Sequence, residues 1–398
     1  MDSIKQAMRD VQHFGEEGGV APVIDVASTS TFLDPKDMGR TFKGELEGCY
    51  LYSRHSNPTV NHFGAKLAAM EGMEAGLGVA SGMAAIACAI LQLLPEGGHV
   101  VSSRTVYGGT WALFANLLPK RGITTTFVDP NDVAAFEAAI RPDTKVLYTE
   151  TISNPILAVA DLGALGALAK KRGLSLVVDN TFAPLLVTPS RFGARVVIHS
   201  CTKYISGASD LIAGAVVADK KFIASLIDVN AGAVMLLGPV MDPRVAHELY
   251  MRLDHLALRM AAHAAAADKL ARRLDAEKIR VIYPGLESYP HRALMAKMAN
   301  PGYGSGGMMT VDCGSTERAL ALAAALQDKK FGLYAVSLGF SRTLMSIPSI
   351  STSSEIPESE QKMMGLSEGL LRLSVGYTGD DATMIERFLA CWRALPQK

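Results

Sequence analysis

The sequence predicts an α/β protein with a mostly parallel central sheet and a smaller α+β domain at its C-terminal end. Between residues 56 and 240, short β-branched runs alternate with helical patterns, and such alternation builds a parallel sheet covered on both faces. The chain has 398 residues, which is more than one hydrophobic core usually holds. We therefore expect two domains and an N-terminal arm.

The predicted large domain comprises residues 56–240. Its expected strands are rich in Val, Ile and Thr and end at polar residues. They are HVVSS, TTTFVD, KVLYTE, LSLVVDN, RVVIHS and GAVVAD. Helical patterns such as NHFGAKLAAMEGM and DLGALGALAKKRG lie around and between these runs.

The two ends of the chain have different patterns. Residues 1–55 alternate short polar and apolar pieces with glycine and proline, which is typical of an extended arm that packs on a neighbouring subunit. Residues 241–398 contain the alanine-rich helical pattern RMAAHAAAADKLARRLDA, followed by mixed strand and helix patterns. We expect this second region to form the small domain.

Composition and charge exclude several classes of partner. Lys plus Arg and Asp plus Glu each total 39, so no basic excess is available for nucleic acid or an anionic membrane. The chain shows no signal-peptide core and no apolar run of roughly 20 residues, so we expect a cytoplasmic location. Five widely spaced cysteines, without a C-x-x-C pair, predict neither a disulfide framework nor a metal site.

Polar residues at the ends of two predicted strands indicate a ligand site. In open parallel sheets, ligands bind beyond the carboxyl ends of the strands. Asp179 ends the run LSLVVD, and Lys203 follows the run VVIHS. An acid and an ammonium thus leave two strands of one sheet and could face one ligand.

Two glycine-containing turns add to this set. Ser81, Gly82 and Met83 begin a long helical pattern, and the free N–H groups at a helix N-terminus bind phosphate. Tyr107, in the turn VYGGT, could cover a flat ligand with its aromatic face. A phosphate cradle, an aromatic cover, an acid and a lysine form a coherent binding site.

Each of these residues also has a simpler interpretation. A lone lysine after a strand is usually solvated, and an aspartate there often only caps a helix. Ser81 and Gly82 could begin an ordinary helix, and Tyr107 could simply pack in its turn. The joint occurrence of all of them in one sheet favours the binding site.

The stretches SGMAA, VYGGT, VVDNTFAPLL, SCTKYISG and YSRHSNPT together resemble the cystathionine γ-synthase/γ-lyase family of pyridoxal 5'-phosphate (PLP) enzymes. The resemblance runs in order over nearly the whole chain. YLYSRHSNPTV and VIYPGLESYP look most like the plant-type methionine γ-lyases. The resemblance implies the aspartate-aminotransferase-like fold, fold type I, with a mostly parallel seven-stranded central sheet.

The resemblance also implies how PLP is held. Lys203 would bind it as a Schiff base and serve as acid and base, Asp179 would pair with the pyridine nitrogen, and Tyr107 would stack on the ring. The remaining cofactor contacts would come from Ser81, Gly82, Met83, Ser200, Thr202, Tyr52, Arg54 and Asn154.

Two further implications concern subunits and substrate. In the family, the counterparts of Tyr52 and Arg54 come from the neighbouring subunit, which implies a homo-oligomer, a tetramer built from dimers that share active sites. Arg372, in LLRLSVG, would clamp the carboxylate of an amino-acid substrate near Ser337, whereas its simpler interpretation is a solvated strand edge.

The implied reaction is γ-elimination of L-methionine, and of related amino acids such as homocysteine, with Tyr107 as a candidate acid for the departing sulfur. One alternative is γ-replacement on an O-acylhomoserine, as in cystathionine γ-synthases and homoserine sulfhydrylases; another is a cystathionine γ-lyase. Arg342 replaces a glutamate of cystathionine-handling relatives, so it would repel the distal ammonium of cystathionine and could meet an acyl group. A scaffold or regulator without catalysis is disfavoured by the intact site residues.

Overall fold

The central sheet has seven strands in the order β1-β7-β6-β5-β4-β2-β3. The structure is a computed structural model that describes residues 3–11, 18–46, 48–351, 353 and 355–396. The strands of this sheet are β1 (Ala75–Val79), β2 (Gly98–Ser103), β3 (Ile123–Val128), β4 (Thr144–Glu150), β5 (Ser175–Asp179), β6 (Val196–Ser200) and β7 (Gly214–Ala218).

The sheet is mostly parallel. Strands β3, β2, β4, β5 and β6 run parallel to one another, whereas β7 is antiparallel to both β6 and β1. No helix separates β6 from β7, so the chain reverses directly between them. The predicted fold class and the six predicted strands are confirmed.

Strand β1 is the one strand of this sheet that the sequence reading missed, because its sequence AGLGV contains two glycines. Helix α3 (Pro58–Glu71) lies so close to it that a Cβ atom on Gly64 would be 2.2 Å from the carbonyl oxygen of Gly76. The close contact explains the glycines, and glycine weakens the β-branched pattern by which strands are found.

Helices cover both faces of the sheet, as its alternating side chains require. Val177 and Ile198 belong to the same buried cluster as α4 residues, whereas Val178 and Val197 pack in the cluster that includes residues of α3 and α7. The remaining helices of this region are α4 (Gly82–Leu93), α5 (Gly108–Ala112), α6 (Val133–Ala138), α7 (Leu162–Arg172), α8 (Lys220–Leu226), α9 (Ala233–Leu237) and α10 (Pro243–Leu253).

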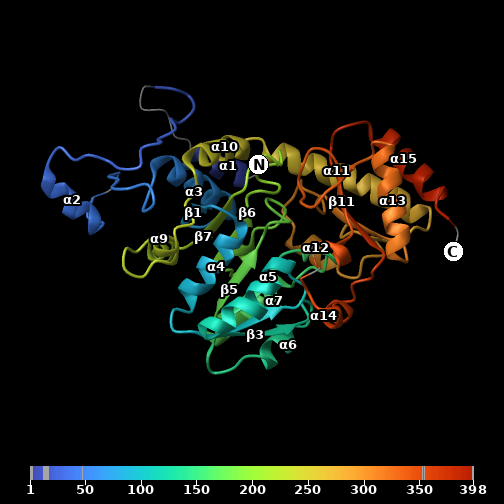
Figure 1. The fold of residues 1–398 in the computed structure, drawn as a ribbon, viewed down its shortest axis with the longest axis horizontal. Coiled ribbons are helices and arrows are strands. Elements are labelled where there is room, and N and C mark those ends of the chain that lie inside the picture. The colour runs from blue at the N-terminus through green and yellow to red at the C-terminus, as the bar shows by residue number, and fades with distance from the viewer. Residues whose placement is uncertain (1–2, 12–17, 47, 352, 354, 397–398) are drawn as a thin grey trace.

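The C-terminal region lies beside the seven-stranded sheet, and the long helix α11 (Leu256–Ala276) leads from α10 into this region and packs on C-terminal elements (Figure 1). Its five-stranded sheet has the order β10-β11-β12-β9-β8. The elements are β8 (Val281–Ile282), β9 (Met308–Asp312), β10 (Leu333–Tyr334), β11 (Leu344–Ser346), β12 (Leu370–Ser374), α12 (Arg292–Met298), α13 (Thr316–Asp328), α14 (Glu358–Met363) and α15 (Asp381–Arg393). Strand β12 is central, which excludes the solvated edge as an interpretation of Arg372.

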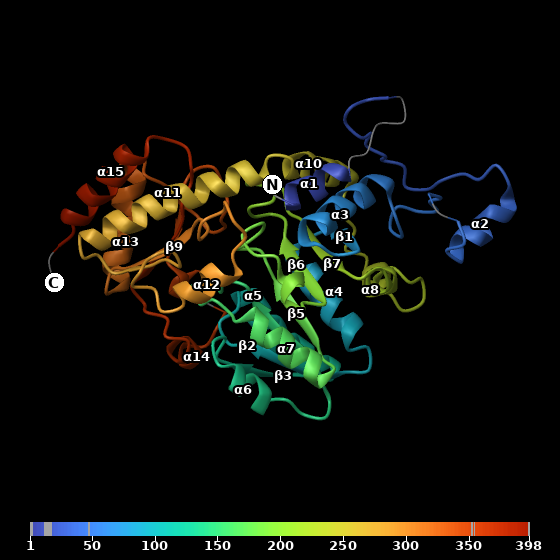
Figure 2. The ribbon, with the colours of Figure 1, turned by 180° about the vertical axis from the view of Figure 1, so that it is seen from behind.

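The N-terminal region is an extended segment with two short helices. Helix α1 (Ser3–Asp10) packs on α3, whereas α2 (Pro35–Phe42) projects away from the rest of the chain in both views (Figures 1 and 2). Residues 1–2, 12–17 and 47 of the predicted arm lie outside the described residues. Among the helices that the structure describes, none is long and apolar enough to cross a membrane.

Candidate active site

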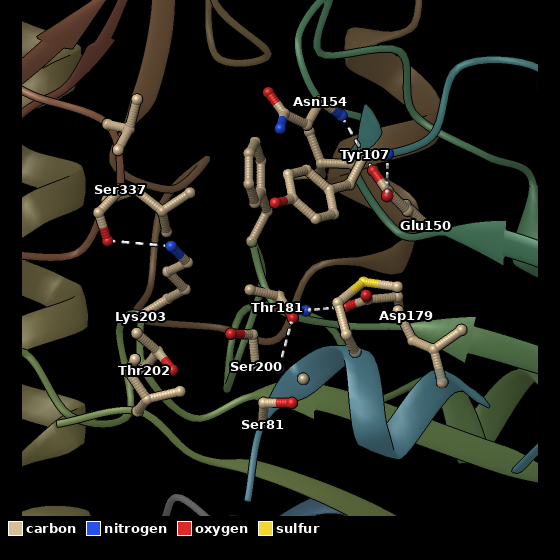
Figure 3. A pocket seen from close by; sticks show the side chains of 18 of the residues that line it. Ser81, Tyr107, Glu150, Asn154, Asp179, Thr181, Ser200, Thr202, Lys203 and Ser337 are labelled. Carbon is tan, nitrogen blue, oxygen red and sulfur yellow. Dashed lines mark hydrogen bonds between the residues drawn. The ribbon is translucent and has the colours of Figure 1, made fainter. Parts of the chain in front are cut away.

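A cavity of about 280 Å³ lies beyond the carboxyl ends of β4, β5 and β6, where it meets the loop that precedes β11 (Figure 3). It brings together most of the site residues predicted from the sequence: Ser81, Gly82, Met83, Tyr107, Asn154, Asp179, Ser200, Thr202, Lys203, Ser337 and Arg372. These residues come from separate parts of the chain, so only the fold makes them neighbours.

Lys203 enters the cavity from the turn that follows β6. Its Nζ donates a hydrogen bond to Ser337 Oγ at 3.0 Å. Burial, and then the positive charge of Arg372, lower the pKa of Lys203 to about 8. The lowered pKa increases the fraction of free amine, which is the form that can act as a nucleophile or a base.

Asp179 lies in the cavity wall at the end of β5 and is 9% exposed. Its Oδ1 accepts a hydrogen bond from the Thr181 backbone N–H at 2.9 Å. Burial raises the pKa of Asp179, whereas the hydrogen bonds from Thr181 and the nearby His199 oppose the rise. A carboxylate that is buried away from water stabilises a positively charged partner, such as a protonated ring nitrogen.

The N-terminus of α4 forms a second part of the site. Ser81 is the N-cap and accepts a hydrogen bond from the Ala84 N–H at 3.1 Å, while the N–H groups of Gly82 and Met83 have no partner within the helix. A Cβ atom on Gly82 would lie 2.7 Å from Ser200 Cβ. This glycine keeps open a cradle of backbone donors and hydroxyl groups, which fits a phosphate.

Tyr107 is the N-cap residue that precedes α5, and it is 39% exposed. Its ring projects into the cavity, as Figure 3 shows. A Cβ atom on Gly109 would lie 2.6 Å from Tyr107 Cε1, so the ring packs directly on this glycine. Burial, and then the charge of Glu355, raise the pKa of Tyr107, which keeps the phenol protonated at neutral pH.

Arg372 lies in the central strand β12 with only 2% of its surface exposed. Its Nη1 donates to Asn154 Oδ1 at 2.8 Å, and its Nη2 donates to the Ser337 carbonyl oxygen at 3.2 Å. Burial lowers the pKa of Arg372 to about 10, so the guanidinium stays charged at neutral pH. Over the described part of the chain no carboxylate forms an ion pair with it, which suits an arginine that binds an anionic ligand.

Three predicted residues do not line the cavity of this chain. Tyr52 is 48% exposed, and Arg54 donates to the Met235 carbonyl oxygen at 3.0 Å. Arg342 is exposed on the loop before β11 and lies outside the cavity lining. Arg342 does not line the cavity within one chain, and its contact with the substrate stays a prediction.

The cavity also contains residues that the sequence reading missed. Glu150 and Thr181 are polar residues at or just after the ends of β4 and β5, the position that identified Asp179. The rule that found Asp179 could therefore have found both. The other missed residues are apolar, and no local pattern marks them: Ile86, Ile152, Phe182, Ile212, Val336 and Leu338.

Comparison with known proteins agrees with this site. The model of the family described as "Cys/Met metabolism PLP-dependent enzyme" matches residues 5–384. Methionine gamma-lyase of Arabidopsis thaliana is 46% identical over 94% of this chain and 86% of its own length. Cystathionine gamma-lyase of Bacillus subtilis is 37% identical over 91% of this chain and 92% of its own.

A similar solved structure is that of a putative O-acetylhomoserine (thiol)-lyase from Campylobacter jejuni, with a TM-score of 0.90 and 27% identity. The match covers 99% of this chain and 100% of that one, which contains a pyridoxyl-lysine monophosphate. The fold, the buried lysine and the phosphate cradle define a PLP-dependent enzyme. The chain belongs to the Cys/Met metabolism family of PLP-dependent enzymes.

Proposed function

We propose that this enzyme catalyses γ-elimination of L-methionine and of related sulfur amino acids such as L-homocysteine. With water, methionine would give methanethiol, 2-oxobutanoate and ammonia. The observation that carries the proposal is the 46% identity to a methionine gamma-lyase over 94% of the chain. The cavity supports it, because a buried arginine and a lysine with a lowered pKa both line it.

Each of the two residues has a distinct task in this proposal. PLP, when bound, supplies an electron sink for negative charge on the substrate's α-carbon. Arg372 binds the substrate carboxylate with its planar fork and thereby orients the α-hydrogen. The amine of Lys203 removes that proton, and the lowered pKa makes the amine form more abundant at neutral pH than it is in an ordinary lysine.

The sulfur end of the substrate meets a different part of the cavity. Tyr107 keeps its proton because its pKa is raised, so it can protonate the departing sulfur. The six apolar side chains of the cavity wall suit an uncharged methylthio group better than the distal charges of cystathionine. This apolar wall supports methionine as the preferred substrate.

The proposed PLP contacts follow the same cavity. Asp179 would face the ring nitrogen and Tyr107 the ring, with Asn154 near the phenolic oxygen. The phosphate would be held by Ser81, Gly82, Met83, Ser200 and Thr202, together with Tyr52 and Arg54 of a neighbouring subunit. Since Tyr52 and Arg54 lie outside the cavity of their own chain, they are available to a second one.

The proposed assembly is a homotetramer of dimers that share their active sites. Apolar side chains of the N-terminal segment are exposed in the single chain, as are two on α9, and a neighbouring subunit would bury them. They are Val20, Val23, Ile24, Val26, Leu33, Leu236 and Leu237. The cytoplasmic location expected from the sequence stays a prediction.

The second candidate is γ-replacement on an O-acylhomoserine, or γ-elimination of cystathionine. The similarity to a putative O-acetylhomoserine (thiol)-lyase and to a cystathionine gamma-lyase favours these reactions. γ-Replacement needs an added thiol, whereas γ-elimination does not. Elimination from cystathionine differs from elimination from methionine because it releases cysteine and not methanethiol.

A substrate panel on the PLP-loaded enzyme tests the proposal. 2-Oxobutanoate and volatile thiol are measured from L-methionine, L-homocysteine, L-cystathionine and O-acetylhomoserine, with and without added thiol. We expect methanethiol from methionine without any added thiol, and none from the Lys203→Ala control. Product from the ester and thiol alone would instead assign the enzyme to γ-replacement.

A further inference from the structure

Glu150 is a buried carboxylate in the cavity to which the proposed reaction gives no task. It is the last residue of β4, lines the cavity and is only 6% exposed. Among the ion pairs of the described residues, none includes Glu150. Burying a carboxylate without a cationic partner is costly, so its hydrogen bonds must account for its presence.

Both oxygens of Glu150 accept backbone N–H groups. Oε1 accepts from the Tyr107 N–H at 2.7 Å, and Oε2 accepts from the Asn154 N–H at 2.9 Å. Figure 3 shows the carboxylate between these two segments, with one dashed bond to each. Each of the two oxygens of a carboxyl group can accept a hydrogen bond, whereas the amide of glutamine has one acceptor oxygen and an NH2 group that only donates.

The two segments held by Glu150 carry different parts of the site. Tyr107 places its ring in the cavity from the start of α5. Asn154 uses its side-chain Oδ1 to accept a hydrogen bond from Arg372 Nη1 at 2.8 Å. A continuous chain of hydrogen bonds therefore runs from the Tyr107 turn through Glu150 and Asn154 to Arg372.

We propose that Glu150 is a positioning residue that fixes the Tyr107 ring and the Asn154–Arg372 pair relative to each other. It touches neither of the proposed reacting atoms and acts through its two backbone bonds. The role deepens the proposed function, because the aromatic ring and the arginine would then meet the cofactor and the substrate carboxylate in one fixed geometry.

The electrostatics of the site agree with a function beyond packing. Burial, and then the charge of Asp179, raise the pKa of Glu150 to about 8, although the bonds from Tyr107 and Asn154 oppose the rise. A protein that needed only to fill this space would do so more stably with an uncharged side chain. Retention of a carboxyl group is explained by its capacity to accept two bonds at once.

The test is Glu150→Gln, compared with Glu137→Gln as the control. Glu137 is a large-domain glutamate that pairs with Lys171 and Arg172 outside the cavity. Three properties are measured on PLP-loaded protein: the visible circular dichroism of bound PLP, the Kd of glycine from its effect on that spectrum, and KM and kcat with L-methionine. Glycine has the carboxylate but no leaving group, so it probes Arg372 without the proposed reaction.

We expect Glu150→Gln to reduce the visible circular dichroism band and to raise the glycine Kd by about tenfold or more, since glutamine has one acceptor oxygen where the carboxyl group has two, and one buried backbone N–H group is left unpaired. KM should rise with the glycine Kd, and Glu137→Gln should match the wild type. Unchanged circular dichroism and glycine Kd in Glu150→Gln would overturn the proposal. If the wild type binds glycine but does not cleave methionine, the proposed function fails while the role of Glu150 is still tested.

A second variant covers the case in which Glu150→Gln does not fold. Asn154→Ala keeps both backbone bonds to Glu150 and removes the acceptor for Arg372, together with the proposed contact to the PLP phenolic oxygen. We expect it to raise the glycine Kd, because Arg372 loses the hydrogen bond that fixes its position. An Asn154→Ala variant with the wild-type glycine Kd would contradict the proposed chain of contacts.

Discussion

Ser337 links the lysine that follows β6 of the seven-stranded sheet to the arginine in β12 of the five-stranded sheet. Its Oγ accepts a hydrogen bond from Lys203 Nζ at 3.0 Å, and its carbonyl oxygen accepts one from Arg372 Nη2 at 3.2 Å. Ser337 has a φ of 98°, and residues other than glycine rarely adopt this backbone conformation. Strain of this kind is found where the surrounding structure holds a functional residue in place.

Two substitutions at Ser337 should distinguish the effect of this backbone strain from the effect of losing the hydroxyl group. Ser337→Ala loses the hydroxyl and keeps the strain, whereas Ser337→Gly loses both. We therefore expect the glycine variant to have a free energy of unfolding about 1 kcal/mol higher than the alanine variant. Both should have a lower kcat/KM than the wild type. Urea unfolding and methionine kinetics measure the two effects, and an alanine variant as stable as the glycine variant would exclude the strain.

Lys203→Ala should abolish turnover without unfolding the protein. The side chain supplies the proposed base, and general acid–base groups typically contribute about 10²- to 10⁴-fold to the rate. Little core packing is lost, because the lysine lies in a cavity wall. Activity is followed by 2-oxobutanoate formation and folding by circular dichroism. Retained turnover in a folded variant would remove Lys203 from the mechanism.

The lowered pKa of Lys203 predicts how PLP-free protein captures PLP. The free amine predominates above a pKa of about 8, so the rate of covalent capture should rise through that pH and then level off. Arg372→Gln removes a cation that disfavours the ammonium, so its midpoint should lie at higher pH. Capture is followed by visible absorbance across about pH 6 to 10. Equal midpoints in the two proteins would show that Arg372 does not influence the lysine.

Ser81 and Ser315 provide a matched pair of helix caps. Ser81 accepts from Ala84 N–H at the start of α4, in the cavity, and Ser315 accepts from Arg318 N–H at the start of α13, away from it. Replacing either serine with alanine should cost about 1 kcal/mol of stability. Only Ser81→Ala should also weaken PLP binding, because it loosens the phosphate cradle. Unfolding and PLP titration distinguish the two, and equal PLP affinities would argue against the cradle.

The sequence was sufficient for the elements whose side chains follow a regular pattern. The β-branched runs of β2 to β7 were found, and the position after the strand ends identified Asp179 and Lys203. Strand β1 was missed because close helix packing replaced its pattern with glycines. The apolar cavity wall could not be predicted, since residues such as Val336 and Ile212 come to line the same cavity only through tertiary packing.

Arg342 lies outside the cavity, and this placement makes a prediction that differs from the one based on sequence alone. An exposed side chain away from the binding site usually changes stability and binding little, so Arg342→Ala should keep kcat/KM for L-methionine within about twofold of the wild type. Arg372→Ala, at the buried arginine, is the control that should lose activity. Kinetics with methionine and with cystathionine are compared, because the sequence predicts that Arg342 repels the distal ammonium of cystathionine. If Arg342→Ala lowered kcat/KM for methionine tenfold or more, which corresponds to about 1.4 kcal/mol, Arg342 would have to reach the substrate.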